Sequence, residues 1–146
     1  MKSAITSGFK AAAMGTSSLI PWVKHEARNA ADPCIAQLIA QAGFEGYGRY
    51  WRLIELLADS PEHALPKVGE RAFRRFQIGL RFEDEESFTG YLETLAALDL
   101  IERSEDGRCR IPLIDVTAMK LEAARANGKK GGLKAAANRR SGEIRF

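Results

Sequence analysis

The 146-residue sequence contains few of the residues that build metal, redox or disulfide chemistry. Neither the two cysteines, Cys34 and Cys109, nor the two histidines, His25 and His63, lie at metal-site spacing. Two cysteines do not form the framework of a small secreted domain. No uncharged apolar run approaches the roughly 18 residues that cross a bilayer, and the first 18 residues are too interrupted for a secretory signal. We therefore expect a cytoplasmic protein with no membrane association, no metal and no cofactor.

The sequence also lacks a recognisable catalytic site. The string NGKKGG at 127–132 has glycines and lysines in common with a phosphate-binding loop, but no strand precedes it and no Ser or Thr follows its lysines. The consecutive acids at 83–86 point around a helix rather than converging on a metal. We therefore expect a non-catalytic protein.

The charge is unevenly distributed along the chain. The whole sequence carries a net charge of +3, but residues 120–146 hold eight basic and two acidic residues, a net +6, and residues 1–119 carry −3. A basic tail on a mildly acidic domain points to a polyanionic partner, and a merely solubilising tail is the alternative.

The pattern predicts one mainly α domain with a small β-hairpin, flanked by two segments. We expect a flexible leader at 1–20 with a short helix over 9–14 as an option, a domain at 21–119 and a basic tail at 120–146. The expected helices are 33–42, closed by Gly43; 47–58, entered by a tight turn at Gly46 and Gly48; 68–80; 84–98; 115–126, stopped at Asn127–Gly128; and a weaker one at 133–140.

A short edge strand is expected at 64–66 and a hairpin around Asp106–Gly107. Two helices followed by a hairpin is the order of a winged helix-turn-helix domain. The expected fold is thus a winged helix-turn-helix with a C-terminal helix and a basic tail.

Three groups of basic side chains are candidates for contact with a nucleic-acid backbone. The first is an arginine face on the helix at 68–80, the second is the hairpin and the third is the tail. Their members are Lys67, Arg71, Arg74 and Arg75; Arg108 and Arg110; and Lys129, Lys130, Lys134, Arg139 and Arg140. Guanidinium groups pair two phosphate oxygens at once. An ordinary solvated helix face, or ion pairs with Glu70, is the alternative for the arginine face.

The helix before the hairpin argues against direct base recognition by that helix. In winged-helix DNA-binding proteins it normally enters the major groove. Here residues 84–98 contain four acids and no Lys or Arg, so phosphates would repel them. Either DNA contacts the three basic groups instead, or the domain mainly binds protein.

Residues 24–59 resemble the N-terminal domain of phage and prophage replication proteins related to DnaD. Lys24, His25, Ala27, Arg28, Asn29 and Asp32 are similar to that family's opening, with a two-residue shift before Asp32, and Gly43, Glu45, Gly46, Tyr47, Gly48, Tyr50 and Trp51 match its G-x-E-G-Y-G-x-Y-W block. The later LETLAALDLIERSEDGRCRI and GKKGG are similar to the family's last helix, wing and linker.

The resemblance covers about residues 22–132 and implies a winged-helix domain that acts in replication initiation, binds DNA and often self-associates. Two departures are the acidic helix and the absence of the family's second domain. From the residues themselves, His25, Arg28 and Asn29 are expected to give hydrogen bonds to the polar tips of Tyr50 and Trp51. The preference for single-stranded or duplex DNA stays open, as do a replication or host protein partner and a homo-oligomer.

Overall fold

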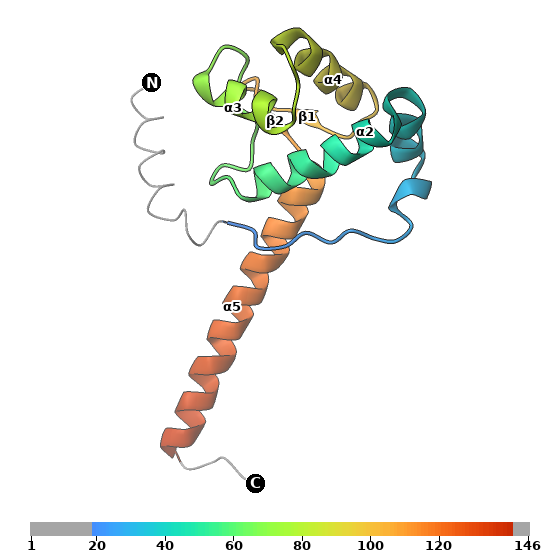
Figure 1. Cartoon of the computed structure of the whole chain (residues 1–146). Helices are drawn as coiled ribbons and strands as arrows, with labels where there is room; N and C mark the ends of the chain where they lie inside the picture. Colours follow the sequence, from blue (N-terminus) through green and yellow to red (C-terminus); the bar gives the residue numbers. More distant parts are fainter. Residues whose placement is uncertain (1–18, 142–146) are drawn as a thin grey trace.

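The computed structural model describes residues 19–141 and places a small helical domain above one long helix (Figure 1). The expectations for residues 1–18 and 142–146 lie outside the described residues. The elements are η1 (Asn29–Ala31), α2 (Pro33–Ala58), α3 (Arg71–Gly79), α4 (Glu85–Ala97), β1 (Glu102–Arg103), β2 (Cys109–Arg110) and α5 (Pro112–Ser141). Mainly helical architecture with one small hairpin confirms the expected fold class.

Helix α2 contains both of the first two expected helices, joined at a kink. Asp32 caps it by accepting hydrogen bonds from the backbone N–H groups of Cys34 (2.9 Å) and Ile35 (3.3 Å). The predicted interruption is confirmed at Gly43, whose φ of 70° is left-handed and suits glycine. The expected turn at Gly46 and Gly48 is wrong, because both lie within the resumed helix.

Gly46 is required for close packing rather than for a turn. It is buried, and a Cβ at this position would overlap the Ala42 side chain. Its carbonyl accepts a hydrogen bond from the Tyr91 hydroxyl at 2.5 Å, which ties α2 to α4. Gly46 therefore permits a close contact across the kink within α2, and its carbonyl joins α2 to α4.

The core lies between α2, α4 and the first turns of α5. Five of its side chains are completely enclosed: Leu38, Ile54, Phe88, Leu95 and Ile114. They come from all three helices, so each helix places its apolar stripe against the others. Burying such side chains is the main favourable contribution to folding.

The wing is a short hairpin with a third, single-residue strand beside it. Glu102 pairs with Arg110 and Arg103 with Cys109 in the antiparallel register expected around the turn. The predicted edge strand is confirmed as a bridge, in which the Leu65 backbone N–H donates to the Cys109 carbonyl at 2.8 Å. This strand, α3, α4 and the hairpin follow the order of a winged helix-turn-helix.

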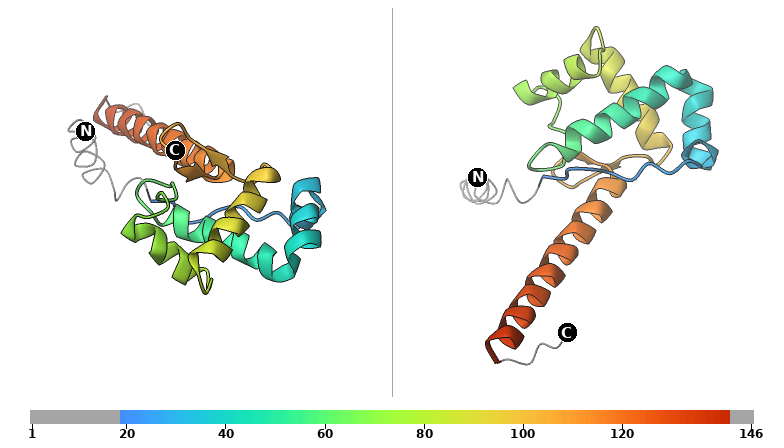
Figure 2. Two further views of the ribbon diagram at one scale, coloured as in Figure 1. Left: turned by 90° about the horizontal axis from the view of Figure 1, so that it is seen from above. Right: turned by 60° about the horizontal axis from the view of Figure 1, so that its bottom comes forward.

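Helix α5 differs most from expectation. It begins at Pro112 rather than after Asp115, and it continues through Asn127 and Gly128 to Ser141. The predicted stop at Asn127–Gly128 is wrong, because the glycines at 128, 131 and 132 keep helical conformation although each costs about 1 kcal/mol relative to alanine. At about 1.5 Å per residue its 30 residues span roughly 45 Å. Two further views show the same helix standing away from the domain (Figure 2).

Candidate nucleic-acid interface

Helix α3 turns the arginine face toward solvent. Arg71, Arg74 and Arg75 are exposed, while Phe73 and Gln77 on the other side of the helix are buried. Within residues 19–139 none of the three arginines forms an ion pair with a carboxylate. The alternative of ion pairing with Glu70 therefore does not apply, and three guanidinium groups on one helix remain accessible to an anion.

Lys67 lies between the arginine face and the hairpin turn. Its backbone N–H donates to the Glu70 carboxylate at 2.6 Å, and its exposed side chain lies beside Gly107. Nearby, the pKa of Asp106 is lowered by hydrogen bonds from the Ser104 hydroxyl and the Arg108 backbone N–H, and the charges of Arg108 and Lys67 add to this effect. The negative charge of Asp106 thus lies close enough to Lys67 to interact with its positive charge.

Arg108, in the wing, is already surrounded by carboxylates. Its guanidinium lies 3.7 Å from Glu62, 3.5 Å from Glu70 and 3.6 Å from Asp106, and only 27% of its side chain is exposed. It ties the loop after α2 and the start of α3 to the hairpin. Its predicted role at a phosphate is therefore not supported by its surroundings, since the guanidinium has three acidic partners.

Arg110 is paired as well, with Asp115 in the first turn of α5 at 3.3 Å. This pair joins the second strand of the wing to the long helix. The two arginines predicted as wing contacts are thus held by acids, and the pairs of Arg108 with Glu62 and Glu70 join segments about 40 residues apart in the sequence that no local pattern reveals.

The outer surface of α4 is acidic, as the sequence indicated. Glu85, Glu86 and Glu93 are exposed, and the capping residue Asp84 accepts a hydrogen bond from the Ser87 backbone N–H at 2.7 Å. This bond lowers the pKa of Asp84, so its carboxylate stays charged. The helix that usually contacts DNA in this fold would therefore place like charges against phosphates.

Helix α5 carries most of the basic tail on one projecting element. Between Lys120 and Ser141 it contains seven basic residues and one acid. Lys129, Lys130, Lys134 and Arg139 are exposed, and Arg140 lies in its last turn. The first part of α5 packs on the domain, where Ile114 and Thr117 are buried and Leu121 is half-buried. The structure thus joins the two helices expected at 115–126 and 133–140 into one continuous helix that ends at Ser141.

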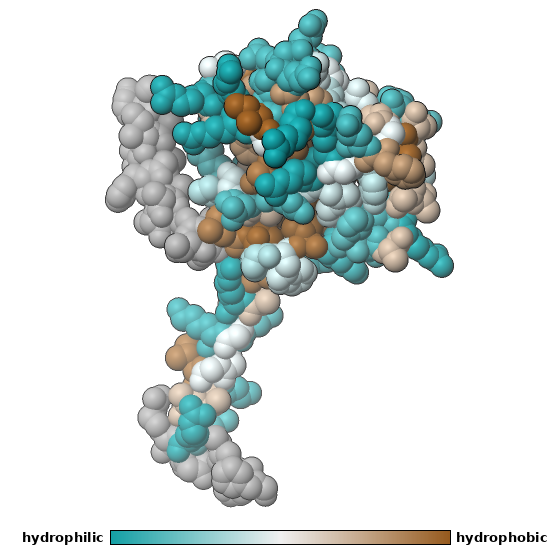
Figure 3. Space-filling model, in the orientation of Figure 1, coloured by the Kyte–Doolittle hydropathy of each residue, from teal (hydrophilic) through white to brown (hydrophobic). Residues whose placement is uncertain are grey.

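The arginine face and the basic part of α5 form two surfaces rather than one. In the views of Figures 1 and 2, α3 lies on one side of α2 and α5 projects from the other. Hydrophilic side chains predominate over the upper part of the domain, where α3 and α4 lie, and recur along α5 among smaller apolar areas (Figure 3). One short nucleic-acid segment on α5 is therefore not expected to reach α3.

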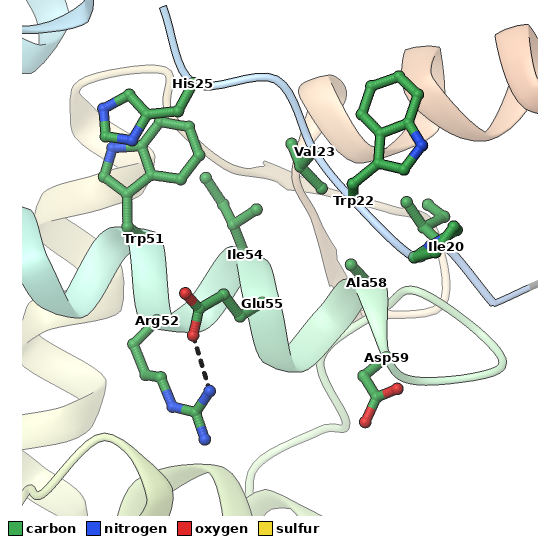
Figure 4. A pocket seen from close by; sticks show the side chains of 11 residues that line it. Ile20, Trp22, Val23, His25, Trp51, Arg52, Ile54, Glu55, Ala58 and Asp59 are labelled. Atoms are coloured by element: carbon green, nitrogen blue, oxygen red, sulfur yellow. Dashed lines mark hydrogen bonds and ion pairs between the residues drawn. The ribbon is translucent and has the colours of Figure 1, made fainter.

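A further cluster holds the extended segment before α2 against the domain. The His25 ring stacks on Trp51 with centroids 3.8 Å apart (Figure 4), and Tyr47 Oη lies 3.1 Å from His25 Nε2. Asn29 donates to the same hydroxyl at 3.3 Å. Beside it lies a cavity of about 580 Å³, partly lined by Trp22 and Trp51.

The prediction that His25, Arg28 and Asn29 hydrogen-bond the tips of Tyr50 and Trp51 is wrong, and His25 and Asn29 bond to another residue. Their partner is Tyr47, and the buried Nε1–H of Trp51 has no hydrogen-bond acceptor among the described residues. Tyr50 instead lies in the core, where burial, followed by the nearby Asp32 and Cys34, raises its pKa to about 12. The EGYGRYW motif is structural in this geometry.

Arg49 is a structural arginine that sequence reasoning missed. Its guanidinium donates to the carbonyls of Leu80 and Arg81, both at 2.9 Å, and lies 4.0 Å from the centre of the Phe82 ring. It joins α2 to the segment between α3 and α4. The sequence places Arg49 inside the GFEGYGRYW motif, but that position does not show where its side chain points.

The described part of the chain lacks two further kinds of feature. Residues 19–141 contain no group of three His, Cys, Asp or Glu side chains placed to hold a metal ion, and no helix among them is long and apolar enough to span a membrane. Comparison of the chain with protein-family models, with curated proteins and with solved structures found no match.

Proposed function

We propose that this protein is a non-catalytic DNA-binding protein that contacts the phosphate backbone. The main support for this proposal is helix α5, which projects into solvent and contains seven basic residues and one acid from Lys120 onward. Such a charge density attracts a polyanion and releases its condensed counterions on binding. The exposed arginine face of α3 is a second contact surface, used by DNA that reaches the other side of α2.

The resemblance to replication proteins related to DnaD suggests the process. It rests on the KHEARNAAD and GFEGYGRYW segments, whose side chains form the contact between the extended segment before α2 and α2 itself. We propose a role in replication initiation in the cytoplasm of a phage-infected or prophage-carrying cell. In this role the protein positions DNA or a partner and performs no chemistry.

A salt titration of DNA binding tests the proposal. The full chain and a chain ending at Arg125 are compared on labelled duplex and single-stranded DNA; the shorter chain keeps Ile114, Thr117 and Leu121, which pack on the domain. We expect binding by the full chain that weakens steeply with salt, and much weaker binding by the shorter chain. Absence of binding by the full chain at low salt would refute the proposal.

The acidic surface of α4 favours one other function, a protein-interaction module. Exposed Glu85, Glu86 and Glu93 would attract a basic protein surface, including one from a replication or host protein. This function predicts a complex that persists when α5 is neutralised and that weakens when the α4 acids are replaced by glutamine. Such a result, without DNA binding, would replace the first proposal.

A further inference from the structure

One side of α5 carries a straight row of side chains suited to base edges. Residues at alternating spacings of four and three share a face of a helix, and from Lys120 onward this spacing selects Lys120, Ala124, Asn127, Gly131, Lys134 and Asn138. The row contains no acid and no large apolar residue. All its members except the half-buried Asn138 are exposed.

We infer that this row faces the floor of the major groove of duplex DNA, so that α5 takes the place that α4 usually has in the fold. The inference rests on the proposed function and adds the DNA form, the groove and the contacting face. Asparagine pairs with the N6 and N7 edge of adenine, and lysine donates to O6 and N7 of guanine. Asn127 and Lys134 occupy the centre of the row, seven residues apart on one side of the helix.

The dimensions of the helix fit this groove. An α-helix with side chains is about 10–12 Å wide and the major groove is about 12 Å wide. Ala124 and Gly131 narrow the helix along the row and let its backbone approach the bases. A Cβ at Gly131 would meet nothing within 4 Å in the protein, so the domain does not require glycine there.

The rest of the helix surface supports the same orientation. Lys129 lies on the side opposite the row, about 140° around the helix from Lys134, and Glu122 lies away from the row too. In this arrangement the groove walls, which carry the phosphates, flank the helix on both sides. Basic side chains distributed around the helix then meet phosphates while the row meets bases.

Binding to a DNA duplex, to an RNA duplex of equal charge but different groove shape, and to a single strand without a groove tests the inference. The full chain is measured against a B-form DNA duplex, an RNA duplex of the same sequence and the single DNA strand. The major groove of A-form RNA is too deep and narrow for side chains to read. We expect the DNA duplex to bind at least tenfold more tightly than the other two, with guanine N7 atoms protected from methylation by dimethyl sulfate.

Matched variants then separate base contacts from backbone contacts. On the best-bound sequence selected from a random duplex pool, Asn127→Ala and Lys134→Gln should each weaken binding about fivefold or more, with a smaller loss on unselected duplex. Lys129→Gln removes the same charge as Lys134→Gln from the other side of α5 and should weaken binding equally on both duplexes.

Two substitutions at Gly132, outside the row, test whether the helical form itself is bound. Nothing lies within 4 Å of a Cβ there, so the domain stays folded, which a thermal melt verifies. Gly132→Ala strengthens the helix and should strengthen binding up to about fivefold. Gly132→Pro interrupts it without changing the charge and should abolish N7 protection while weak, salt-sensitive binding remains.

The outcomes distinguish the inference from the function on which it rests. Equal affinity for DNA and RNA duplexes, unprotected N7 atoms, no enriched sequence, or no effect of Gly132→Pro would overturn the groove placement and leave backbone binding intact. No binding to any of the three nucleic acids at low salt would refute both.

Discussion

Neutralising three lysines of α5 should remove a calculable part of the salt dependence of DNA binding. Replacing Lys129, Lys130 and Lys134 by glutamine deletes three exposed positive charges and keeps side chains of similar helix propensity. Each phosphate neutralised on a duplex contributes about 0.9 to the slope of log K against log salt. Six positive charges that α5 brings to the duplex give a slope of about −5, and the triple variant, with three fewer, should give about −3.

Between 50 and 200 mM salt these slopes separate clearly. The affinity of the natural chain should fall about a thousandfold, and that of the variant should fall by a factor of a few tens. Fluorescence anisotropy on a labelled 12-base-pair duplex measures both. The matched control replaces Arg71, Arg74 and Arg75 by glutamine; because α3 lies across α2 from α5, it should change the slope on this short duplex by less than one. An unchanged slope for the lysine variant would refute the reasoning.

Four further changes test the fold. Phe88→Ala empties a fully enclosed core position and should lower the free energy of unfolding in urea by about 3–5 kcal/mol; a loss below about 1 kcal/mol would contradict the packing. Gly46→Ala forces a Cβ against Ala42 and should cost about 2 kcal/mol, whereas an unchanged melting temperature would show that α2 adjusts freely. Arg108→Gln should destabilise the domain by about 1 kcal/mol and leave the salt slope unchanged within one unit; a slope change of one or more would return Arg108 to the DNA interface. Because burial raises the pKa of Tyr50 from 10.0 to about 12, its contribution to stability is present below pH 10 and lost as the pH rises from 10 to 12. Tyr50→Phe should therefore reduce the fall of the melting temperature over that range, and an identical fall would contradict this assignment.

The elements of the domain were predictable where apolar spacing and local capping agreed. Asp32 and Asp84 both start helices as their sequence context indicates, and the Asp106–Gly107 turn sets the register of the hairpin. The local rule failed at Gly46, where the helix continues and a Cβ would overlap Ala42 across the kink at Gly43. A glycine required by close packing within a kinked helix has the same appearance in sequence as a glycine required by a turn.

The candidate site was only partly predictable. The arginine face follows from i, i+3, i+4 spacing and is exposed as expected. Arg108 and Arg110 were indistinguishable in sequence from surface arginines, because their acidic partners Glu62, Glu70 and Asp115 come from other elements. The row on α5 was missed because a helix ending at Gly128 cannot place Asn127 and Lys134 on one face.

The acidic α4 and the proposed DNA contact on α5 are compatible because of where the helices lie. In the view of Figure 1, α4 lies above α2 and the projecting part of α5 extends below it. At physiological ionic strength, charges in water are largely screened beyond about 8 Å, and a helix alone is at least about 10 Å across. DNA on α5 therefore experiences little of the repulsion from α4, whereas DNA approaching α4 itself experiences all of it. The acids thus do not weaken the proposed complex; they disfavour the docking mode usual for this fold and leave the projecting helix as the preferred contact.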